Sequence, residues 1–339
     1  MRILGIEASC DETAAAIVEN GVKILSSVVA SSSQMHAASG GVIPEVAARQ
    51  QVVSILPVVD KALVNAKCQM TNVDSVAITI GPGLIGSLLV GVETAKVLAL
   101  IFKKPIIPVN HLVAHLYANW LGGGSHIPKF PALALVVSGG HTDLVLMKDH
   151  GNLKWIGGTR DDAAGEAFDK CARIIGLPYP GGPAISAKAE GYLNQKPKSL
   201  NLFPRPMIHN DNFDWSFSGL KTSVLKYFKT HEHIEKGQIA AEIQEAIVDV
   251  LVKKTLRAAG IFKPRSLLLA GGVAANLRLR EKFELEIRNL KLDIVFNVPP
   301  PSLCTDNAAY ISSYAFFNQK PSSLGQIFAR PELTIVGQP

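Results

Sequence analysis

The stretch ILGIEASCDETAAAIVE occupies residues 3–19 and introduces the pattern on which the fold is built. An apolar, β-rich run leads into a turn of small polar residues and then into a second β-rich run. The same layout returns at residues 133–148, LALVVSGGHTDLVLMK. Small side chains in such turns leave backbone amides open to an anion. Two copies of one layout predict a duplicated lobe.

A third turn of this kind interrupts the run LLLAGGVAAN at residues 267–276, where a buried strand is expected to lead into a helix. The N-terminus of that helix could receive a phosphate or a ribose. Three such turns together outline a nucleotide cleft, although a single glycine-rich turn most often only reverses the chain.

Helical periodicity fills the intervals between the strands. The expected helices span residues 45–64, 86–101, 163–175, 238–259 and 305–317. Strands that alternate with helices predict an α/β architecture, and a proline cluster at residues 104–108 lies close to the expected lobe boundary. The helix at 305–317 is expected to return to the first lobe.

The bulk composition suits two soluble domains. The chain has 339 residues, of which 47% are hydrophobic. A chain of this length is too long for one ordinary hydrophobic core. No run approaches the ~18 consecutive apolar residues of a membrane span, and no basic, apolar leader precedes the first strand. Cys10, Cys68, Cys171 and Cys304 share no short spacing, so no disulfide framework is indicated. We expect a cytoplasmic protein with no membrane segment.

The positive charge is concentrated in one part of the chain. Residues 196–291 contain 17 Lys and Arg against 10 Asp and Glu, a surplus of +7, whereas the remainder contains 17 against 18. Such a segment could contact a polyanion through its phosphates, or it could be an ordinary solvated helical face.

The segment NHLVAH at residues 110–115 contains the sharpest local signal for a metal. His111 and His115 are four residues apart, so on a helix both imidazoles would lie on one face and could hold one ion. Histidines at this interval also occur as plain surface or core residues. Asp306 offers a third ligand at the expected start of the last helix, where an anion is favoured.

Many segments, in this order, resemble the TsaD family of tRNA threonylcarbamoyladenosine transferases from residue 3 to about residue 310. They are IEASCDET (6–13), GGVIPEVAAR (40–49), GPGLIGSLLVG (81–91), NHLVAH (110–115), VVSGGHT (136–142), DDAAGEAFDK (161–170), YPGGP (179–183), FPRPM (203–207), WSFSGLKT (215–222), AGGVAAN (270–276) and CTDNAA (304–309). The FPRPM segment is typical of bacterial members.

The resemblance implies two duplicated actin-like (ASKHA, RNase H-like) α/β lobes with a nucleotide and metal cleft between them. Residues 1–108 and 305–330 would form the N-terminal lobe, and residues 109–304 the C-terminal lobe. In the family, one iron(2+) or zinc(2+) ion is bound at the positions of His111, His115 and Asp306. Three protein ligands leave coordination sites open, as a catalytic metal requires.

The implied donor is threonylcarbamoyl-AMP, the adenylate of an activated threonyl carbamate. The family contacts it at positions that correspond to Val136, Val137, Ser138, Gly139, Gly140, Asp169, Gly182 and Asn276. Ser138 and the two glycine amides suit phosphate or carbonyl oxygens. Asp169 could accept hydrogen bonds from ribose, Gly182 permits close backbone approach, and Asn276 offers a donor and an acceptor.

The implied reaction transfers the threonylcarbamoyl group to the exocyclic amine of adenosine 37 in tRNAs that read codons beginning with adenine, and AMP departs. No enzyme nucleophile is required. A weakly nucleophilic aromatic amine would benefit from a base, for which Asp11 is our candidate and His141 an alternative. Glu12 is expected to lie in the cleft.

The implied partners are tRNA and two proteins of the bacterial system, the smaller paralogue TsaB and the P-loop ATPase TsaE. Arg205, Lys221, Lys226 and Lys229 are the candidate contacts to tRNA phosphates. The helix around residues 86–95, with Gly86 and Gly91 on one side, could pack against a partner or inside its own lobe.

Three rival functions are consistent with parts of the pattern. A small-molecule kinase of the same superfold should lack the paired histidines. A metalloendopeptidase of the zincin type would need Glu as a general base beside His111, where this chain has Leu112. An ATP-driven scaffold or chaperone would bind exposed peptides rather than tRNA.

Overall fold

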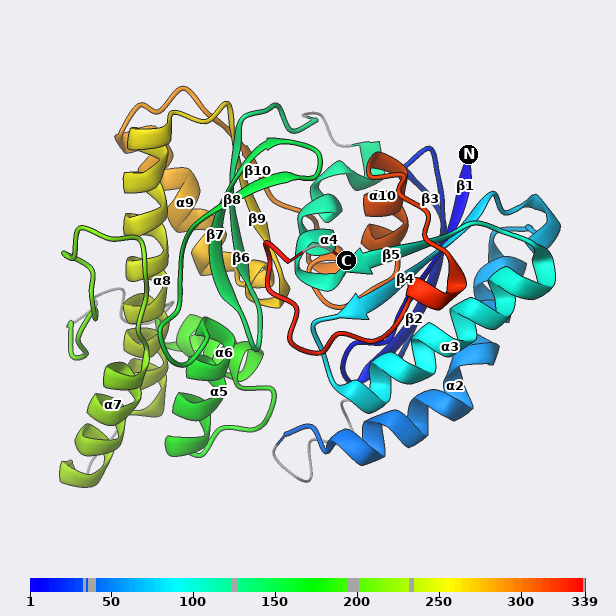
Figure 1. Cartoon of the computed structure of the whole chain (residues 1–339). Coiled ribbons are helices and arrows are strands. Elements are labelled where there is room, and N and C mark those ends of the chain that lie inside the picture. Colours follow the sequence, from blue (N-terminus) through cyan, green and yellow to red (C-terminus); the bar gives the residue numbers. More distant parts are fainter. Residues whose placement is uncertain (33–34, 36–40, 124–126, 194–200, 232–234, 338) are drawn as a thin grey trace. The chain divides into compact units, whose positions relative to one another are not determined.

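The computed structural model describes residues 1–32, 35, 41–123, 127–193, 201–231, 235–337 and 339, so Gly40 and Lys196 at the ends of two segments discussed above lie outside it. The chain forms two compact units (Figure 1). Unit 1 comprises Met1–Pro128, His150–Asn152 and Pro299–Pro339, and unit 2 comprises Lys129–Asp149 and Leu153–Val298.

The first unit extends further along the chain than the expected boundary at residue 108. Residues 109–128 belong to unit 1 because helix α4 (His111–Tyr117) packs against helix α10 (Ala309–Phe317), which itself lies on strand β1 (Arg2–Glu7). The histidine pair is therefore part of unit 1, together with the segment that contains Asp306.

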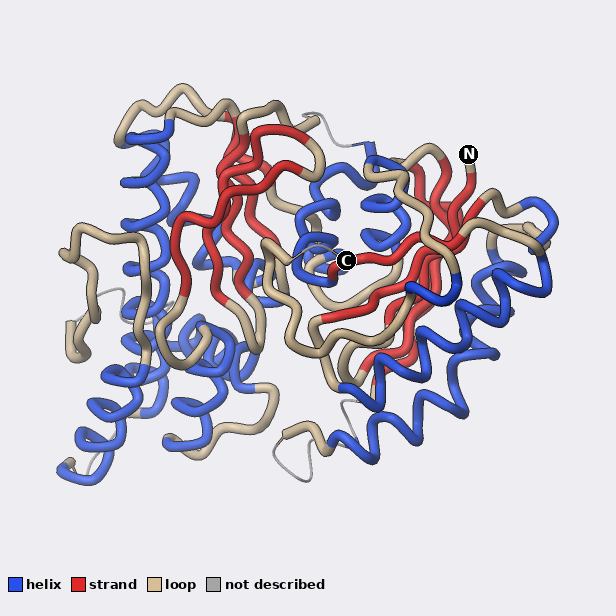
Figure 2. Tube along the Cα trace, in the orientation of Figure 1, coloured by secondary structure: helices blue, strands red, loops and turns tan. Residues whose placement is uncertain are grey.

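A five-stranded mixed sheet organises unit 1. Its order is β3–β2–β1–β4–β5, with β2 at Glu12–Glu19, β3 at Lys23–Ser31, β4 at Ser75–Gly81 and β5 at Ile106–Asn110. β1 pairs antiparallel with β2 and parallel with β4. Helices α2 (Pro44–Asn65) and α3 (Ile85–Phe102) cover one face and α4 and α10 the other (Figure 2). Because both faces are covered, β1 and β4 are almost entirely buried and mostly apolar, with Glu7 and Thr79 as buried polar residues.

Unit 2 repeats this sheet. The order β8–β7–β6–β9–β10 matches β3–β2–β1–β4–β5 strand for strand. β6 (Ala132–Val137) pairs antiparallel with β7 (Thr142–Asp149) and parallel with β9 (Ser266–Ala270), as β1 does with β2 and β4. The outer strands are β8 (Asn152–Gly158) and β10 (Val295–Asn297). The duplication and the α/β class predicted from the sequence are confirmed.

Unit 2 contains the predicted helices and two, α6 (Gly181–Leu193) and α7 (Ser218–Thr230), that the sequence pattern did not predict. The predicted helices are α5 (Ala164–Ile174), α8 (Lys236–Phe262) and α9 (Leu277–Asn289). Short 3-10 turns occur at Met70–Asn72, Ala118–Gly123, Gly272–Ala275, Pro301–Leu303 and Leu324–Gln326. The expected helices 163–175 and 238–259 differ from α5 and α8 by only one to three residues at each end.

The last helix begins later than expected. α10 starts at Ala309, whereas the sequence pattern predicted a helix from residue 305. The Asn307 side chain explains the difference, because its Oδ1 accepts hydrogen bonds from the backbone amides of Ala309 (3.0 Å) and Tyr310 (3.4 Å). Asp306 therefore lies in the turn before the helix rather than in its first turn.

Helix α3 is unusually apolar for a surface helix. Among the described residues it is the one helix long and apolar enough to cross a membrane, with a mean hydropathy of 1.9 over 18 residues. Glu93 and Lys96 interrupt the apolar run and form an ion pair of 2.9 Å. Its inner face packs on β4, and a third of the helix is buried. The feature that needs an explanation is its exposed apolar side.

Candidate metal centre and glycine-rich turns

The start of α4 is set by Asn110, the last residue of β5. Its Oδ1 accepts from the backbone amides of Leu112 (3.0 Å) and Val113 (3.4 Å), which caps the helix. Its Nδ2 donates to the backbone oxygens of Thr334 (2.8 Å) and Gly337 (3.1 Å) in the C-terminal segment. The helix therefore begins at His111, and His115 lies one turn later on the same face.

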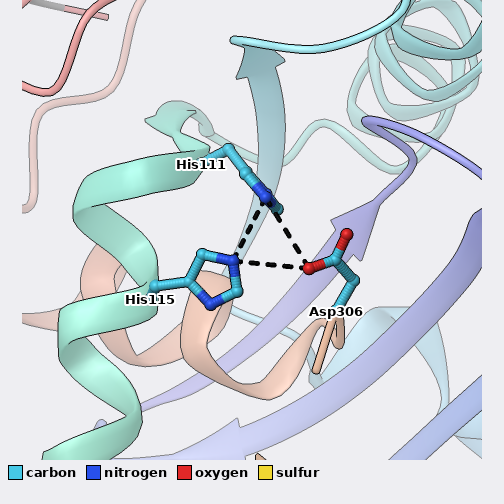
Figure 3. A group of neighbouring side chains, drawn as sticks. All are labelled: His111, His115 and Asp306. Carbon is cyan, nitrogen blue, oxygen red and sulfur yellow. Dashed lines mark hydrogen bonds and ion pairs between the residues drawn. The ribbon is translucent and has the colours of Figure 1, made fainter. Parts of the chain in front are cut away.

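His111, His115 and Asp306 converge although Asp306 is distant in the sequence. Figure 3 shows both imidazoles projecting from α4 toward the Asp306 carboxylate in the turn before α10. The His111 and His115 Nε2 atoms are 3.2 Å apart, and Asp306 Oδ1 is 3.7 Å from the first and 3.3 Å from the second. Both histidines are buried and Asp306 is half-buried.

These separations fit a single metal ion. Ligand atoms at ~2.1 Å from a metal are about 3.0 Å apart in octahedral and about 3.4 Å apart in tetrahedral geometry. The three observed separations lie close to this range. Two imidazole nitrogens and one carboxylate oxygen form a donor set that suits zinc or non-haem iron(2+) and leaves positions open.

Two further buried polar residues, Glu7 and Tyr310, contact the three candidate ligands. The Glu7 carboxylate is fully buried at the end of β1 and accepts a hydrogen bond from His111 Nδ1 (2.9 Å). Tyr310 is also fully buried, with its hydroxyl 3.4 Å from Asp306 Oδ1 and 3.5 Å from His115 Nε2. Sequence reasoning missed both residues. An acidic residue that ends an otherwise apolar strand was the available signal for Glu7.

The pKa values of the two histidines are shifted in opposite directions. Burial disfavours the charged form of His111, but the carboxylates of Glu7 and Asp306 outweigh it and raise its pKa to about 9. Burial lowers the pKa of His115, even though it hydrogen-bonds to Asp306. The pKa of Asp306 is lowered, because the charge of His111 and the contact with His115 outweigh its burial. At neutral pH, His111 is thus protonated when no metal is bound.

Metal uptake should therefore release a proton. His111 has a pKa of about 9, so below that pH it must lose one proton before Nε2 can coordinate. We expect the apparent zinc affinity to rise by about tenfold per pH unit between pH 6 and 8. Isothermal titration in buffers of different ionisation enthalpy measures the proton count directly. Uptake at pH 7 without proton release would contradict this protonation state.

The turn between β1 and β2 adds carboxylates to the same region. Burial, together with the nearby Asp306 and Asp11, raises the pKa of Glu12 to about 9. Gln51 holds this turn in place, since its Nε2 donates to the backbone oxygens of Cys10 (2.9 Å) and Glu12 (3.1 Å). Carboxylates crowded together in this way would be stabilised by a bound cation.

The turn after β6 contains Ser138, Gly139 and Gly140, which are predicted to bind the adenylate donor. Ser138 closes it, with its amide donating to the His141 oxygen (2.9 Å) and its Oγ accepting from the His141 amide (3.2 Å). Gly139 and Gly140 are exposed. Val136 and Val137 are fully buried within β6, so only their backbones could contribute to ligand binding.

Two glycines allow the backbone to pack closely behind this turn. A Cβ at Gly165, in α5, would lie 2.5 Å from the Ser138 oxygen. A Cβ at Gly271, where β9 ends with φ +90°, would lie 2.3 Å from the Val137 oxygen. The turns after the parallel neighbours β6 and β9 are thereby brought together within unit 2.

Asp169 and Asn276, which are also predicted to bind the adenylate donor, make hydrogen bonds within the protein. Asp169 Oδ1 accepts from the Gly181 amide (2.7 Å) at the start of α6, next to Gly182. Asn276 caps α9 by accepting from the Leu279 amide (2.9 Å). Its Nδ2 lies 2.9 Å from Ser186 Oγ and 2.9 Å from Gln244 Oε1. Both side chains thus organise helix starts in unit 2.

Comparison with known proteins assigns the chain. The family model of TsaD, tRNA N6-adenosine threonylcarbamoyltransferase, matches residues 23–313. The chain belongs to the TsaD family. The protein of that name from Dehalococcoides mccartyi is 51% identical over 317 residues, covering 94% of this chain and 93% of the relative. The one from Kosmotoga olearia is 48% identical and covers 99% of each chain.

Solved structures agree on the fold at much lower identity. Component A of (R)-2-hydroxyglutaryl-CoA dehydratase from Acidaminococcus fermentans superposes with a TM-score of 0.54 at 14% identity, covering 93% of this chain and 98% of that one. HypF from T. kodakarensis gives 0.61 at 13% identity, covering 94% of this chain and 47% of HypF. The fold is the two-lobed actin-like (ASKHA) type.

Proposed function

We propose that this chain transfers the threonylcarbamoyl group from threonylcarbamoyl-AMP to the exocyclic amine of adenosine 37 in tRNAs that read codons beginning with adenine. The observation that carries the proposal is membership of the TsaD family over nearly the whole chain. The convergence of His111, His115 and Asp306 supports it from the chemistry of the site.

The reaction requires no enzyme nucleophile. The adenosine nitrogen attacks the carbamoyl carbon, the bond from that carbon to the phosphate oxygen breaks, and AMP leaves with the electron pair. The attacking amine loses one proton. Asp11 is our proposed proton acceptor. It lies in the acidic turn between β1 and β2, where its charge and that of Asp306 help to raise the pKa of Glu12.

The metal proposal assigns His111, His115 and Asp306 as the ligands of iron(2+) or zinc(2+). When bound, such an ion would supply Lewis acidity toward the threonyl carboxylate or the carbamoyl carbonyl. The surrounding chain contributes a buried setting in which these polar groups act strongly.

The donor proposal assigns the adenylate to the turns of unit 2. The exposed Gly139 and Gly140 and the half-buried Ser138 present small side chains suited to phosphate oxygens. Asp169 and Asn276 already fix the starts of α6 and α9. For them we propose contacts with the ribose and adenine in addition to this role.

Reconstitution tests the reaction directly. Purified protein, with TsaB and TsaE, is incubated with unmodified tRNA, threonine, bicarbonate, ATP and the adenylate-forming synthase, and nucleosides are analysed by mass spectrometry. We expect threonylcarbamoyladenosine and AMP to appear together. Modified nucleoside that forms equally well without this chain would refute the proposal.

The tRNA proposal rests on α7 and its surroundings. Lys226 and Lys229 are exposed on α7, and Lys221 is half-buried there. Arg205 is less suited to this role than its sequence position suggested, because it is mostly buried and bonded to Asp249 (2.8 Å) and to the Phe203 oxygen (2.7 Å). We therefore assign the phosphate contacts to the lysines of α7.

Replacing Lys226 and Lys229 together by alanine should weaken tRNA binding and flatten its salt dependence. Two lost phosphate contacts would lower the slope of log affinity against log salt by about 1.4 to 1.8. Fluorescence anisotropy across a salt titration measures the slope. Lys320→Ala, an exposed lysine of unit 1, is the control. An unchanged slope in the double variant would exclude α7 from the surface that contacts tRNA.

For TsaB we propose docking on the exposed apolar side of α2 and α3. Val53 and Leu56 on α2 are 70% and 60% exposed, and Leu100 on α3 is 64% exposed. The small residues of α3 face inward, since a Cβ at Gly91 would lie 3.0 Å from Ala8 Cβ. The larger apolar side chains thus remain for a partner. We propose TsaE as a further partner of the same assembly. We also propose that the assembly works in the cytoplasm, where tRNA is modified.

Leu56→Glu should disrupt the complex with TsaB. A buried charge at the centre of an apolar interface is expected to cost about 2 kcal/mol or more, or roughly 30-fold in affinity. Analytical ultracentrifugation of the two proteins measures it. Leu290→Glu makes the same change at a 56% exposed site of unit 2 and should bind normally. Equal affinity of both variants would place TsaB elsewhere.

A further inference from the structure

We propose that Glu7 is a positioning residue that fixes the tautomer and orientation of His111, so that its Nε2 presents a lone pair to the metal. The inference rests on the metal centre proposed above and concerns a residue that does not itself belong to the ligand set. The hydrogen bonds that support this role lie within unit 1.

The Glu7 carboxylate is held at both oxygens. Oε1 accepts from the Ser9 amide (2.7 Å), and Oε2 accepts from the Thr79 hydroxyl (2.6 Å) and from His111 Nδ1 (2.9 Å). Glu7 is fully buried and Thr79 is 1% exposed. A buried carboxylate with such partners has little freedom to turn away from the imidazole.

This arrangement determines which nitrogen of His111 carries the proton. An ionised carboxylate only accepts hydrogen bonds, so Nδ1 must be the protonated nitrogen of the neutral ring. The lone pair is then on Nε2, the atom that lies 3.2 Å from His115 Nε2 and 3.7 Å from Asp306 Oδ1. A carboxylate behind a metal-binding imidazole also raises the basicity of the ligand.

His111 and His115 differ in this support. His115 Nδ1 is buried and has no hydrogen-bond partner among the described residues. Among the described residues, hydrogen bonding at Nδ1 therefore supports His111 and not His115. Ser9 Oγ lies 3.4 Å from His111 Nδ1 and could donate to it if the carboxylate were lost, which would favour the tautomer that cannot bind metal through Nε2.

Zinc affinity of the apo protein, measured by competition with a chromogenic chelator, tests the inference. Glu7→Gln should weaken zinc binding by about 10- to 100-fold, the usual effect of losing an outer partner of a metal ligand. Thr79→Val, which removes one donor to Glu7 without changing charge, should weaken it several-fold. Thr79→Ser keeps the hydroxyl and should bind close to wild type.

Two controls separate positioning from a structural role. Glu93→Gln makes the same chemical change at an exposed position of α3 and should leave zinc affinity unchanged. Thermal unfolding of each apo variant reports stability independently of metal. Nitrogen-15 shifts of the imidazoles in the zinc-loaded protein should show His111 protonated at Nδ1 in the wild type and in Thr79→Ser.

The outcomes distinguish this inference from the metal proposal. Wild-type zinc affinity in both Glu7→Gln and Thr79→Val would overturn the role of Glu7 and leave the metal centre intact. A wild-type protein that binds no zinc or iron would overturn the metal centre itself. If Glu7→Gln does not fold, the zinc affinities of Thr79→Val and Thr79→Ser, together with the nitrogen-15 shifts of the imidazoles, still test the role of Glu7.

Discussion

His115→Ala is expected to abolish both metal binding and threonylcarbamoyl transfer. His115 is 1% exposed, and its Nε2 lies 3.2 Å from that of His111 and 3.3 Å from Asp306 Oδ1. Losing an outer partner of a ligand costs 10- to 100-fold in metal affinity, so losing a ligand should cost more than about 100-fold. Metal content after dialysis and nucleoside mass spectrometry measure the two losses.

His209→Ala is the matched control, because His209 is exposed in unit 2 and lies outside the ligand set. It should retain metal and activity. Full transfer activity in a His115→Ala protein shown to be free of metal would end the metal proposal, while leaving the family assignment as it stands.

Gly271→Ala is expected to destabilise unit 2 severely and to weaken donor binding. Gly271 has φ +90°, which L-residues rarely adopt, and its Cβ would lie 2.3 Å from the Val137 oxygen and 2.8 Å from the Val137 carbonyl carbon. Both clashing atoms are backbone atoms of β6, so β6 and β9 must separate. We expect a loss of about 3 kcal/mol or more in unfolding free energy.

The neighbouring glycine provides the comparison for this variant. Gly272 has an ordinary φ, and a Cβ there would meet no atom within 4 Å. Urea unfolding of Gly271→Ala and Gly272→Ala, with donor binding by calorimetry, should separate the two variants clearly. Equal stability of both would contradict the close packing of the turns behind Ser138.

The repeated strand, turn and strand pattern was enough to predict the duplicated α/β fold. Strand order in the two sheets is the same, and helices α3 and α5 end within one residue of their expected limits. The start of α10 could not be placed by periodicity, because the Asn307 side chain caps the helix at Ala309. The boundary of unit 1 depends on the packing of α4 against α10, a contact between distant segments.

The candidate site was only partly visible in the sequence. The spacing of His111 and His115 indicated a shared helical face. Asp306 is 191 residues from His115, so it could be offered as a ligand only from its place near the last helix and through the family resemblance. Glu7 and Tyr310 went unnoticed because their role depends on tertiary contacts with Thr79, His111 and Asp306. Side chains that support a ligand have no fixed spacing from it.

Anomalous diffraction from crystals of the metal-loaded protein tests the central claim most directly. We expect one peak at the zinc or iron edge, about 2.1 Å from His111 Nε2, His115 Nε2 and an Asp306 oxygen. A peak coordinated by other residues, or no peak in protein that carries out the transfer, would contradict the account.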